Sequence, residues 1–327
     1  MTRPKKQMSL VADVGGTNSR VALADGPRVI HATIRRYRNA DFLGFESVLR
    51  CFIADQTDVE IAAACIAVAG PVGNGCATMT NLDWTIDAET VAQVLRAERV
   101  TILNDLQAQG YALDHIPSDS IHAIIPGGAA APRANRLVIG VGTGFNAACV
   151  YETDAGRIVA ASESGQVTLP VRDETDLRLC RHISQPGPIP AVEDVLSGPG
   201  LERIYAWMGA EAGDPRTATA KHIMADCADG GDARAVATAR YFTRMLGTVV
   251  GNLALIHLPF GGIFLVGGVA RAFEPFLTDL GFVEAFRDKG RFASFMSAFG
   301  VSLIEDDDAA LTGAARHLAR LLADPVR

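Results

Sequence analysis

The residues of this sequence that are best suited to chemistry are an aspartate and a pair of glycines near its start. Asp13 ends an apolar run, and Gly15 and Gly16 follow it before a second apolar run begins. Glycines permit positive φ, and without side chains they let backbone N–H groups approach a bound anion closely. A carboxylate beside them can bind a divalent cation, directly or through water. The alternative is a hairpin turn with an incidental aspartate, which the two glycines alone would favour.

This pattern of strand, glycine-rich loop and strand occurs twice. The first copy spans 10–23 and the second spans 137–151, where the loop is Gly142-Thr143-Gly144. Each copy continues into a turn that contains Asp and Gly and then into a third strand, at 25–32 and 154–160. Repetition of one supersecondary unit is informative about the fold. Two such units that faced one another would form a cleft with a phosphate-binding loop on each wall.

Asn104 and Asp105 follow the short apolar run 100–103, so they stand at the carboxyl end of an expected strand. Ligands of open α/β sheets gather at such ends. There an aspartate can accept a hydroxyl proton, and an asparagine can bind another hydroxyl as donor and acceptor. The alternative, an aspartate that caps the following helix, fits the local sequence equally well. Glu163 and Glu193 lie in loop-like segments, where a carboxylate on its own is more often a solvated surface charge.

Other catalytic and cofactor motifs are missing from the sequence or fail on context. The glycines of the second loop match the dinucleotide fingerprint, and Glu163 lies about twenty residues on, but that fingerprint needs a helix after its glycines. A strand is expected there instead. The only lysines are 5, 6, 221 and 289, which excludes a P-loop, and the seven histidines show no metal-ligand spacing. His257, inside an apolar helical run, is expected to be structural.

The composition describes an ordinary soluble protein, with 49% hydrophobic and 20% charged residues. The net charge of -7 argues against a nucleic-acid-binding surface. The start of the chain lacks the apolar stretch of a signal peptide, and no apolar run is long enough to span a membrane. Six scattered cysteines without a C-x-x-C pair are typical of free thiols in a reducing cytoplasm and argue against a metal cluster. A length of 327 residues predicts two domains.

The elements that would position these residues are strands that first pair with one another and then alternate with helices. Three strands are expected in 8–37, an amphipathic helix over 42–54, and a strand covered on both faces at 61–69. The other expected strands are 100–103 and 263–266, and the other expected helices are 87–97 with Asp87 as cap, 201–209, 233–257 and 309–323. The acidic run 305–308 reads as a solvated loop, after which the last helix could return to pack on the first domain.

These stretches resemble the bacterial glucokinase family, within the sugar kinase/Hsp70/actin superfamily. The matches cover nearly the whole chain in the family's order: 13–18, 79–81, 103–105, 142–144, Glu193 with 195–200, 251–253, 260–262, 267–268 and 288–292. The resemblance implies a two-domain actin-like ATPase (ribonuclease H-like) α/β fold with a cleft between a small and a large domain. The small domain would comprise 1–115 plus about 307–327, and the large domain 116–306.

The resemblance also implies an activity and assigns roles to residues. The activity is ATP- and Mg²⁺-dependent phosphorylation of the 6-hydroxyl of glucose, by a homodimer. Asp105 resembles the general base that takes the proton of this hydroxyl, and Asp13 the carboxylate associated with Mg²⁺. The residues that resemble sugar ligands are Asn81, Asn104, Asp105, Glu163, Gln166 and Glu193. The residues that resemble nucleotide-binding loops are Gly15, Gly16, Thr17, Asn18, Gly142, Thr143 and Gly144 for phosphate, and Gly267 and Gly268 near adenosine.

Two departures from the family pattern bear on the substrate. The family usually has Glu-Gly-Gly-His with the histidine on the sugar, whereas Gln166 ends the corresponding Glu163-Ser-Gly-Gln166. Glutamine donates and accepts hydrogen bonds but carries no charge, so the identity of the hexose stays open among glucose, mannose, fructose and an amino sugar. Asn146 replaces a glycine of the phosphate loop and bears on the fit around phosphate. A non-catalytic sugar- or nucleotide-binding regulator is a further alternative, against which Asp105 and Asp13 argue.

Overall fold

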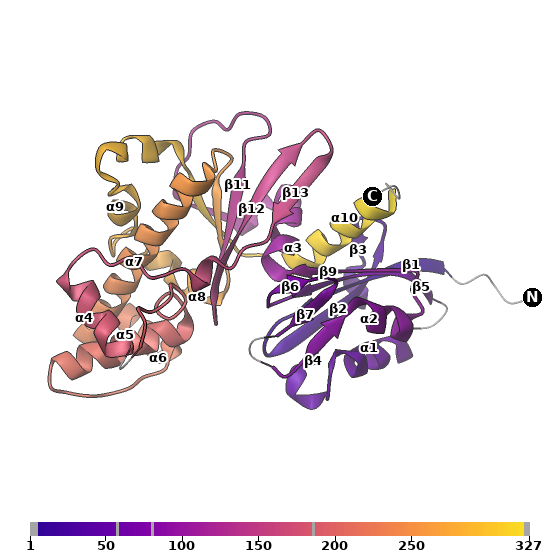
Figure 1. Cartoon of the computed structure of the whole chain (residues 1–327), viewed down its shortest axis with the longest axis horizontal. Coiled ribbons are helices and arrows are strands. Elements are labelled where there is room, and N and C mark those ends of the chain that lie inside the picture. The colour runs from indigo at the N-terminus through magenta and orange to yellow at the C-terminus, as the bar shows by residue number, and fades with distance from the viewer. Residues whose placement is uncertain (1–5, 57–58, 80–81, 185–186, 324–327) are drawn as a thin grey trace, which may run out of the picture. The chain divides into compact units, whose positions relative to one another are not determined.

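The structure of the chain is a computed structural model that describes residues 6–56, 59–79, 82–184 and 187–323 (Figure 1). By its contacts the chain divides into two compact units. The first unit comprises Met1–Pro117 together with Asp306–Arg327, and the second comprises Ser118–Glu305. The first unit is therefore built from both ends of the chain.

A mixed sheet forms the centre of the first unit. Its strands are β1 (Lys6–Val14), β2 (Asn18–Asp25), β3 (Arg28–Val29), β4 (Arg35–Arg38), β5 (Val59–Val68) and β9 (Arg99–Asn104). The order is β3-β2-β1-β5-β9, and β4 also pairs with β2. β1 and β2 are antiparallel, whereas β1, β5 and β9 run parallel, so these three strands end at the same edge. A separate small sheet contains β6 (Val72–Gly73), β7 (Cys76–Thr78) and β8 (Thr85–Asp87).

Helices cover both faces of the first unit's main sheet. α1 (Phe45–Ala54) and α2 (Ala88–Leu95) pack on the face that includes Leu10 and Ala12. α3 (Asp105–Ala112) and α10 (Ala309–Ala323) pack on the opposite face, which includes Val11. Because side chains alternate along a strand, Asp13 belongs to the face of α3 and α10. Figure 1 shows α10, the yellow C-terminal helix, beside α3.

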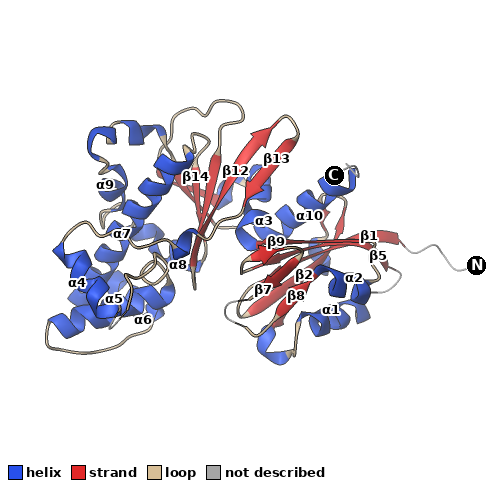
Figure 2. Cartoon of the chain, in the orientation of Figure 1, coloured by secondary structure: helices blue, strands red, loops and turns tan. Residues whose placement is uncertain are grey.

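A second six-stranded sheet forms the centre of the second unit (Figure 2). Its strands are β10 (Ile121–Ile125), β11 (Arg136–Val141), β12 (Phe145–Thr153), β13 (Gly156–Ala160), β14 (Ile263–Val266) and β15 (Val301–Ile304). The order is β10-β15-β14-β11-β12-β13. β11 and β12 are antiparallel, and β14 runs parallel to β11 and to β15.

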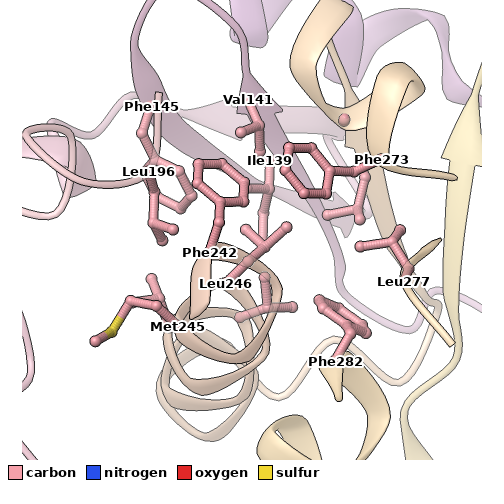
Figure 3. Packing of buried hydrophobic residues seen from close by; sticks show 14 of the residues in the cluster. Ile139, Val141, Phe145, Leu196, Phe242, Met245, Leu246, Phe273, Leu277 and Phe282 are labelled. Carbon is pink, nitrogen blue, oxygen red and sulfur yellow. The ribbon is translucent and has the colours of Figure 1, made fainter. Parts of the chain in front are cut away.

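The helices of the second unit are α4 (Glu174–Ile183), α5 (Gly198–Glu211), α6 (Ala220–Asp229), α7 (Ala233–His257), α8 (Gly268–Phe273) and α9 (Phe282–Arg287). Figure 3 shows the core between the sheet and α7. The rings of Phe242 and Phe273 stack there with their centroids 4.5 Å apart, and Ile139 and Leu246 belong to the same buried cluster. Among the helices that the structure describes, none combines the length and the apolar character needed to cross a membrane.

Several sequence expectations are confirmed at the level of single elements. The helices at 233–257 and 309–323 and the strand at 263–266 have the expected bounds. Asp87 caps α2, accepting a hydrogen bond from Thr90 N at 2.9 Å. The repeated strand–loop–strand–turn–strand pattern is present in both units, and a strand rather than a helix follows the second glycine loop.

Other expectations about local structure were wrong in their bounds. The helix expected from Phe42 begins at Phe45, because Asn39–Asp41 form a 3₁₀ turn and Phe42 packs in extended conformation against Tyr37. The return strand expected over 29–32 is observed at Arg28–Val29, since His31–Thr33 form a 3₁₀ turn. The helix expected from Leu201 begins at Gly198, where the Ser197 side chain accepts a hydrogen bond from Gly200 N.

Candidate active site

The carboxyl ends of three parallel strands meet at one edge of the first unit's sheet. Val14 of β1 pairs with Val68 of β5, and Val68 pairs with Asn104 of β9. Two further bonds join the loops that follow: Ala69 N donates to Val14 O at 2.9 Å, and Asn104 Nδ2 donates to Gly70 O at 3.2 Å. The edge therefore brings together the glycine loop after β1 and the Asn104-Asp105 pair after β9.

Asn104, rather than Asp105, caps the helix that follows β9. Asn104 Oδ1 accepts a hydrogen bond from Leu106 N at 3.0 Å, and Gln107 Oε1 accepts one from Asn104 N at 3.1 Å. The alternative that Asp105 serves as the cap was therefore wrong. Asp105 is the first residue of α3 and half-buried, and its Oδ1 accepts a hydrogen bond from Leu106 N at 2.9 Å. At this end the helix dipole favours the ionised carboxylate.

The loop after β1 is held by a buried asparagine that sequence reasoning missed. Asn39 Nδ2 donates to Gly15 O at 2.7 Å, and Asn39 N donates to Thr17 O at 2.9 Å. Ser19 Oγ donates to Asn39 Oδ1 at 2.7 Å, and Gly15 N closes the turn on Asn18 O at 3.0 Å. Asn39 lies between the strands expected in 8–37 and the helix expected over 42–54, and no motif marks it. Gly15 does not adopt a positive φ, although glycine permits one.

Asp13 lies in a network of opposite charges within the first unit. Its cross-strand partner is Arg20, whose guanidinium donates to Asp307 O and lies 4.0 Å from the carboxylate of Asp308. Removal from water raises the pKa of Asp13; Arg20 opposes this shift, and Asp307 and Asp308 add to it. The acidic run 305–308, expected to be a solvated loop, thus brings two carboxylates toward Asp13.

If Asp13 binds a divalent cation, the protein supplies few of the ligands of that cation. No group of three or more His, Cys, Asp or Glu side chains arranged to hold a metal occurs among the described residues. Mg²⁺ commonly takes one or two carboxylates and fills its other positions with water and substrate phosphate oxygens. An incompletely solvated carboxylate with a raised pKa gains most from a nearby cation, so Asp13 suits that role.

Asn81, an expected sugar ligand, lies outside the described residues.

The glycine loop of the second unit lies at the carboxyl end of β11, beside that of β14. Gly142 N donates to Gly144 O at 2.9 Å, and Gly198 N donates to Gly142 O at 2.9 Å. A Cβ added at Gly142 or Gly268 would meet nothing within 4 Å, so internal packing does not require glycine there. Such space is what a close-fitting phosphate needs.

Two other glycines of this region lie in close contacts, and at Gly267 the contact is with the main chain. A Cβ at Gly144 would lie 2.5 Å from Glu193 Oε2. Gly267 has φ +102°, and a Cβ there would lie 2.5 Å from Val141 O, so only glycine fits between β14 and β11. The loops at 142–144 and 267–268 are therefore neighbours, as their shared sheet edge predicts.

Glu193 is half-buried and bonded, not the solvated charge that it would be in isolation. Its Oε2 accepts a hydrogen bond from Phe145 N at 2.8 Å, and its Oε1 accepts one from Gln166 Nε2 at 3.3 Å. Glu193 N donates to Gly165 O at 2.9 Å. Two of the residues expected on the sugar, Gln166 and Glu193, are thus in contact, and Glu193 adjoins the phosphate loop at Gly144.

Glu163 lies in the same cluster with its side chain more exposed. Asn146 Nδ2 donates to Glu163 Oε2 at 3.3 Å. Partial removal from water raises the pKa of Glu163, and the negative charge of Glu193 raises it further. Asn146, expected to bear on the fit around phosphate, instead directs its side chain to the loop at 162–164.

Comparisons with known proteins agree with this arrangement. The sequence model of the family described as Glucokinase matches residues 10–321. A glucokinase of Rhizobium meliloti (strain 1021) is 33% identical over 307 residues, covering 94% of this chain and 90% of that protein. The crystal structure of a glucokinase from an Antarctic psychrotroph is 31% identical with a TM-score of 0.81, covering 95% of this chain and 98% of that one.

A more distant structure shares the fold alone. It is a ROK family glucokinase from Streptomyces griseus, solved in complex with glucose and AMPPNP, with 20% identity and a TM-score of 0.61 over 96% of this chain and 99% of that one. The family match and the close relatives cover nearly the whole of this chain. The chain therefore belongs to the glucokinase family, and it is an ATP-dependent hexose kinase with the two-domain actin-like fold.

Proposed function

We propose that this protein transfers the γ-phosphoryl group of ATP to the 6-hydroxyl of glucose, with Asp105 as general base. The observation that carries the proposal is the pairing of β1, β5 and β9, which sets Asp105 and the Asp13 loop at one sheet edge. Phosphoryl transfer depends mainly on positioning and charge stabilisation, and an edge of this kind supplies both.

Asp105 takes the proton of the 6-hydroxyl as the new O–P bond forms. Its support is its position as the first residue of α3, where the carboxylate remains half-accessible and the helix dipole favours its ionised form. A carboxylate that is ionised at neutral pH is ready to accept a proton from a bound hydroxyl. The Asn104 cap fixes the backbone on which Asp105 is carried.

The hexose is bound by hydroxyl ligands from several loops. Asn104, Glu163, Gln166 and Glu193 supply amide donors and carboxylate acceptors, which together match the donor and acceptor character of sugar hydroxyls. The contact of Gln166 with Glu193 and the proximity of Glu163 support this group in the second unit. Asn81 belongs to the same proposal on resemblance alone.

The glycine loops bind the phosphates of ATP. The open space at Gly142 and Gly268 and the asparagine-clamped loop at 15–18 support this role. Asp13 would hold Mg²⁺, which, when bound, neutralises phosphate charge and draws electrons from the transferred group. Relatives support these substrates: the Streptomyces griseus protein was solved with glucose and AMPPNP.

We also propose a cytoplasmic homodimer whose domains are the two units described above. All six cysteines are free, as is usual in a reducing compartment. The second unit has an exposed aromatic patch in which Phe295 contacts both Phe260 and Phe292. Patches of this type commonly mark association surfaces, and light scattering of the purified chain at micromolar concentration tests for two copies.

A kinase for a different hexose is the second candidate, because Gln166 places a neutral amide against Glu193. Both candidates are tested by supplying ATP with glucose, mannose, fructose or glucosamine and measuring ADP release, with the product identified by phosphorus NMR. The proposal predicts glucose 6-phosphate and at least about a tenfold preference in kcat/KM for glucose. A preference for another sugar would support the second candidate, and absence of turnover with every sugar would contradict both.

A further inference from the structure

The side chain of Asn146 joins the start of β12 to the loop that carries Glu163. Its Nδ2 donates to Ser162 O at 2.6 Å and to Glu163 Oε2 at 3.3 Å. Its Oδ1 accepts hydrogen bonds from Ser164 N at 3.0 Å and Ser164 Oγ at 3.1 Å. Oδ1 also accepts from Ala147 N at 2.8 Å, so both ends of the amide are engaged.

The loop at 162–166 is also held by Ser162, whose Oγ donates to Ala147 O at 2.7 Å, and by Gln166, whose Nε2 donates to Glu193 Oε1 at 3.3 Å. It contains one short 3₁₀ turn, Ser164–Gln166, and its glutamate is exposed. Gly165 fixes its far side, since a Cβ there would lie 1.9 Å from Phe145 O, and Glu193 N binds Gly165 O. Two adjacent residues therefore hold the loop. The main chain of Phe145 packs closely against Gly165, and the side chain of Asn146 forms hydrogen bonds with Ser162, Glu163 and Ser164.

Each of the two carboxylates in this cluster has a neutral amide donor. Asn146 donates to Glu163, and Gln166 donates to Glu193. The charged group that faces Glu163 is Glu193. Neutral donors hold the two carboxylates in direction without cancelling their charge, so both can still accept hydrogen bonds from sugar hydroxyls.

We propose that Asn146 is a positioning residue for the hexose site: through Ser162, Glu163 and Ser164 it sets the direction in which the Glu163 carboxylate meets a sugar hydroxyl. This inference rests on the proposed function. It assigns to Asn146 a role in binding the sugar and none in binding phosphate. It also makes Ser164 the partner through which Asn146 acts, because Ser164 gives it two of its hydrogen bonds.

The test compares steady-state kinetics of Asn146→Ala, Ser164→Gly and the double variant with wild type. Asn146→Ala is expected to raise KM for glucose about tenfold or more, with KM for ATP within about twofold. The effect of Ser164→Gly is expected to be smaller and to shrink further when Asn146 is already replaced, since the two residues share one network. Asn135→Ala is the matched control, because Asn135 Nδ2 also bonds a main-chain carbonyl, that of His257, away from this loop.

Asn146→Asp adds a second measurement, the pH dependence of KM for glucose, which a purely structural role of Asn146 would not change. The substitution keeps the shape but places a third carboxylate beside Glu163 and Glu193. Near pH 8 repulsion should raise KM for glucose, and toward pH 5.5 a proton shared between the two neighbouring acids should restore a donor and lower it again. The wild-type KM is expected to change less over this range than that of the variant.

An unchanged KM for glucose in Asn146→Ala, or an equal rise in KM for ATP, would overturn the inference. So would an additive double variant combined with a pH-independent KM in Asn146→Asp. Thermal melting of each variant distinguishes loss of the fold from a changed position of the Glu163 side chain. Wild-type turnover is measured first: if no sugar is phosphorylated, the proposed function fails, and calorimetric titration with glucose then tests whether Asn146→Ala weakens binding by itself.

Discussion

The single residue Asp13 shows that a residue suited to ligand binding can lower the stability of the folded protein. Because removal from water raises its pKa, the folded state holds the Asp13 proton more tightly than the unfolded chain does. The ionised carboxylate therefore lowers stability at neutral pH, and this cost shrinks as the pH falls from the raised pKa of the folded state to the ordinary pKa of the unfolded chain. Arg20 reduces the cost without removing it. A group held in this state is better explained by ligand binding than by folding.

Asp13→Asn is accordingly expected to keep or raise the melting temperature at pH 7.5 while kcat/KM for MgATP falls by about 10²-fold or more. Scanning fluorimetry without ligands and steady-state kinetics measure the two effects. Asp25→Asn is the control: Asp25 is an exposed residue of the same hairpin and pairs with Lys6 at 2.9 Å, so both quantities should hardly change. A destabilised Asp13→Asn protein with normal kinetics would contradict this account.

The residues of the site differ in how far the sequence could predict them. The position of Asn104 and Asp105 at the end of a strand was predicted correctly, because a short apolar run stops directly before them. The sequence does not decide which of the two residues caps α3, because asparagine and aspartate are both favoured at that position. Asn39 and Asn146 were missed or given another role, because each acts through contacts with segments more than ten residues away. Nothing in local spacing reveals such contacts.

Among the elements, α3 and α10 bear most directly on Asp105. α10 packs against α3 at Gly313, where an added Cβ would lie 1.7 Å from Ala108 O. The approach leaves no space for a side chain. The position of α3, and with it that of its first residue Asp105, is therefore set in part by a helix from the far end of the chain.

Gly313→Ala is expected to lower the free energy of unfolding by roughly 1–3 kcal/mol, and to lower kcat as α3 shifts, since overpacking forces the backbone to move. Urea denaturation and steady-state kinetics measure these effects. Gly231→Ala is the matched control, because a Cβ there meets nothing within 4 Å. If the two variants are equally stable and active, the contact does not position α3.

Prediction of the elements succeeded where apolar periodicity was strong. The long α7 was found at its observed bounds because large apolar residues such as Phe242, Leu246 and Val250 mark its buried face. The closing helix α10 was also found at its bounds, although its buried face is mostly alanine with Leu311 and Leu318. α3 was not predicted as a helix with bounds, since its buried residues are chiefly small: Leu106, Ala108, Gly110 and Ala112. Helices that pack closely through alanine and glycine carry a weak hydrophobic pattern, and only the partner helix explains them.

In the molecule as a whole, the first unit depends on the last residues of the chain. α10 buries Ala310, Leu311 and Ala314 against the sheet face that includes Val11 and Cys65. The second unit has its own sheet and core, formed entirely from residues between Ser118 and Glu305. The two units should therefore respond differently to loss of the C-terminus.

A chain that ends after Glu305 is expected to lose the fold of the first unit, because an apolar sheet face would be left in water. Limited proteolysis with mass spectrometry should find residues before about 117 digested early and the 118–305 region protected. The full-length chain under the same conditions is the control. Equal protection of both regions in the shortened chain would show that α10 is dispensable for the first unit.

The central claim is that Asp105 removes the proton of the sugar hydroxyl, and the kinetics of Asp105→Asn test it most directly. The substitution keeps the shape and suits the start of a helix, so melting temperature and calorimetric glucose affinity should stay close to wild type. Asp279→Asn, at an exposed aspartate of the second unit, is the control and should retain full activity. The account predicts that kcat of Asp105→Asn falls by about 10²-fold or more; a folded variant with turnover near that of wild type would contradict it.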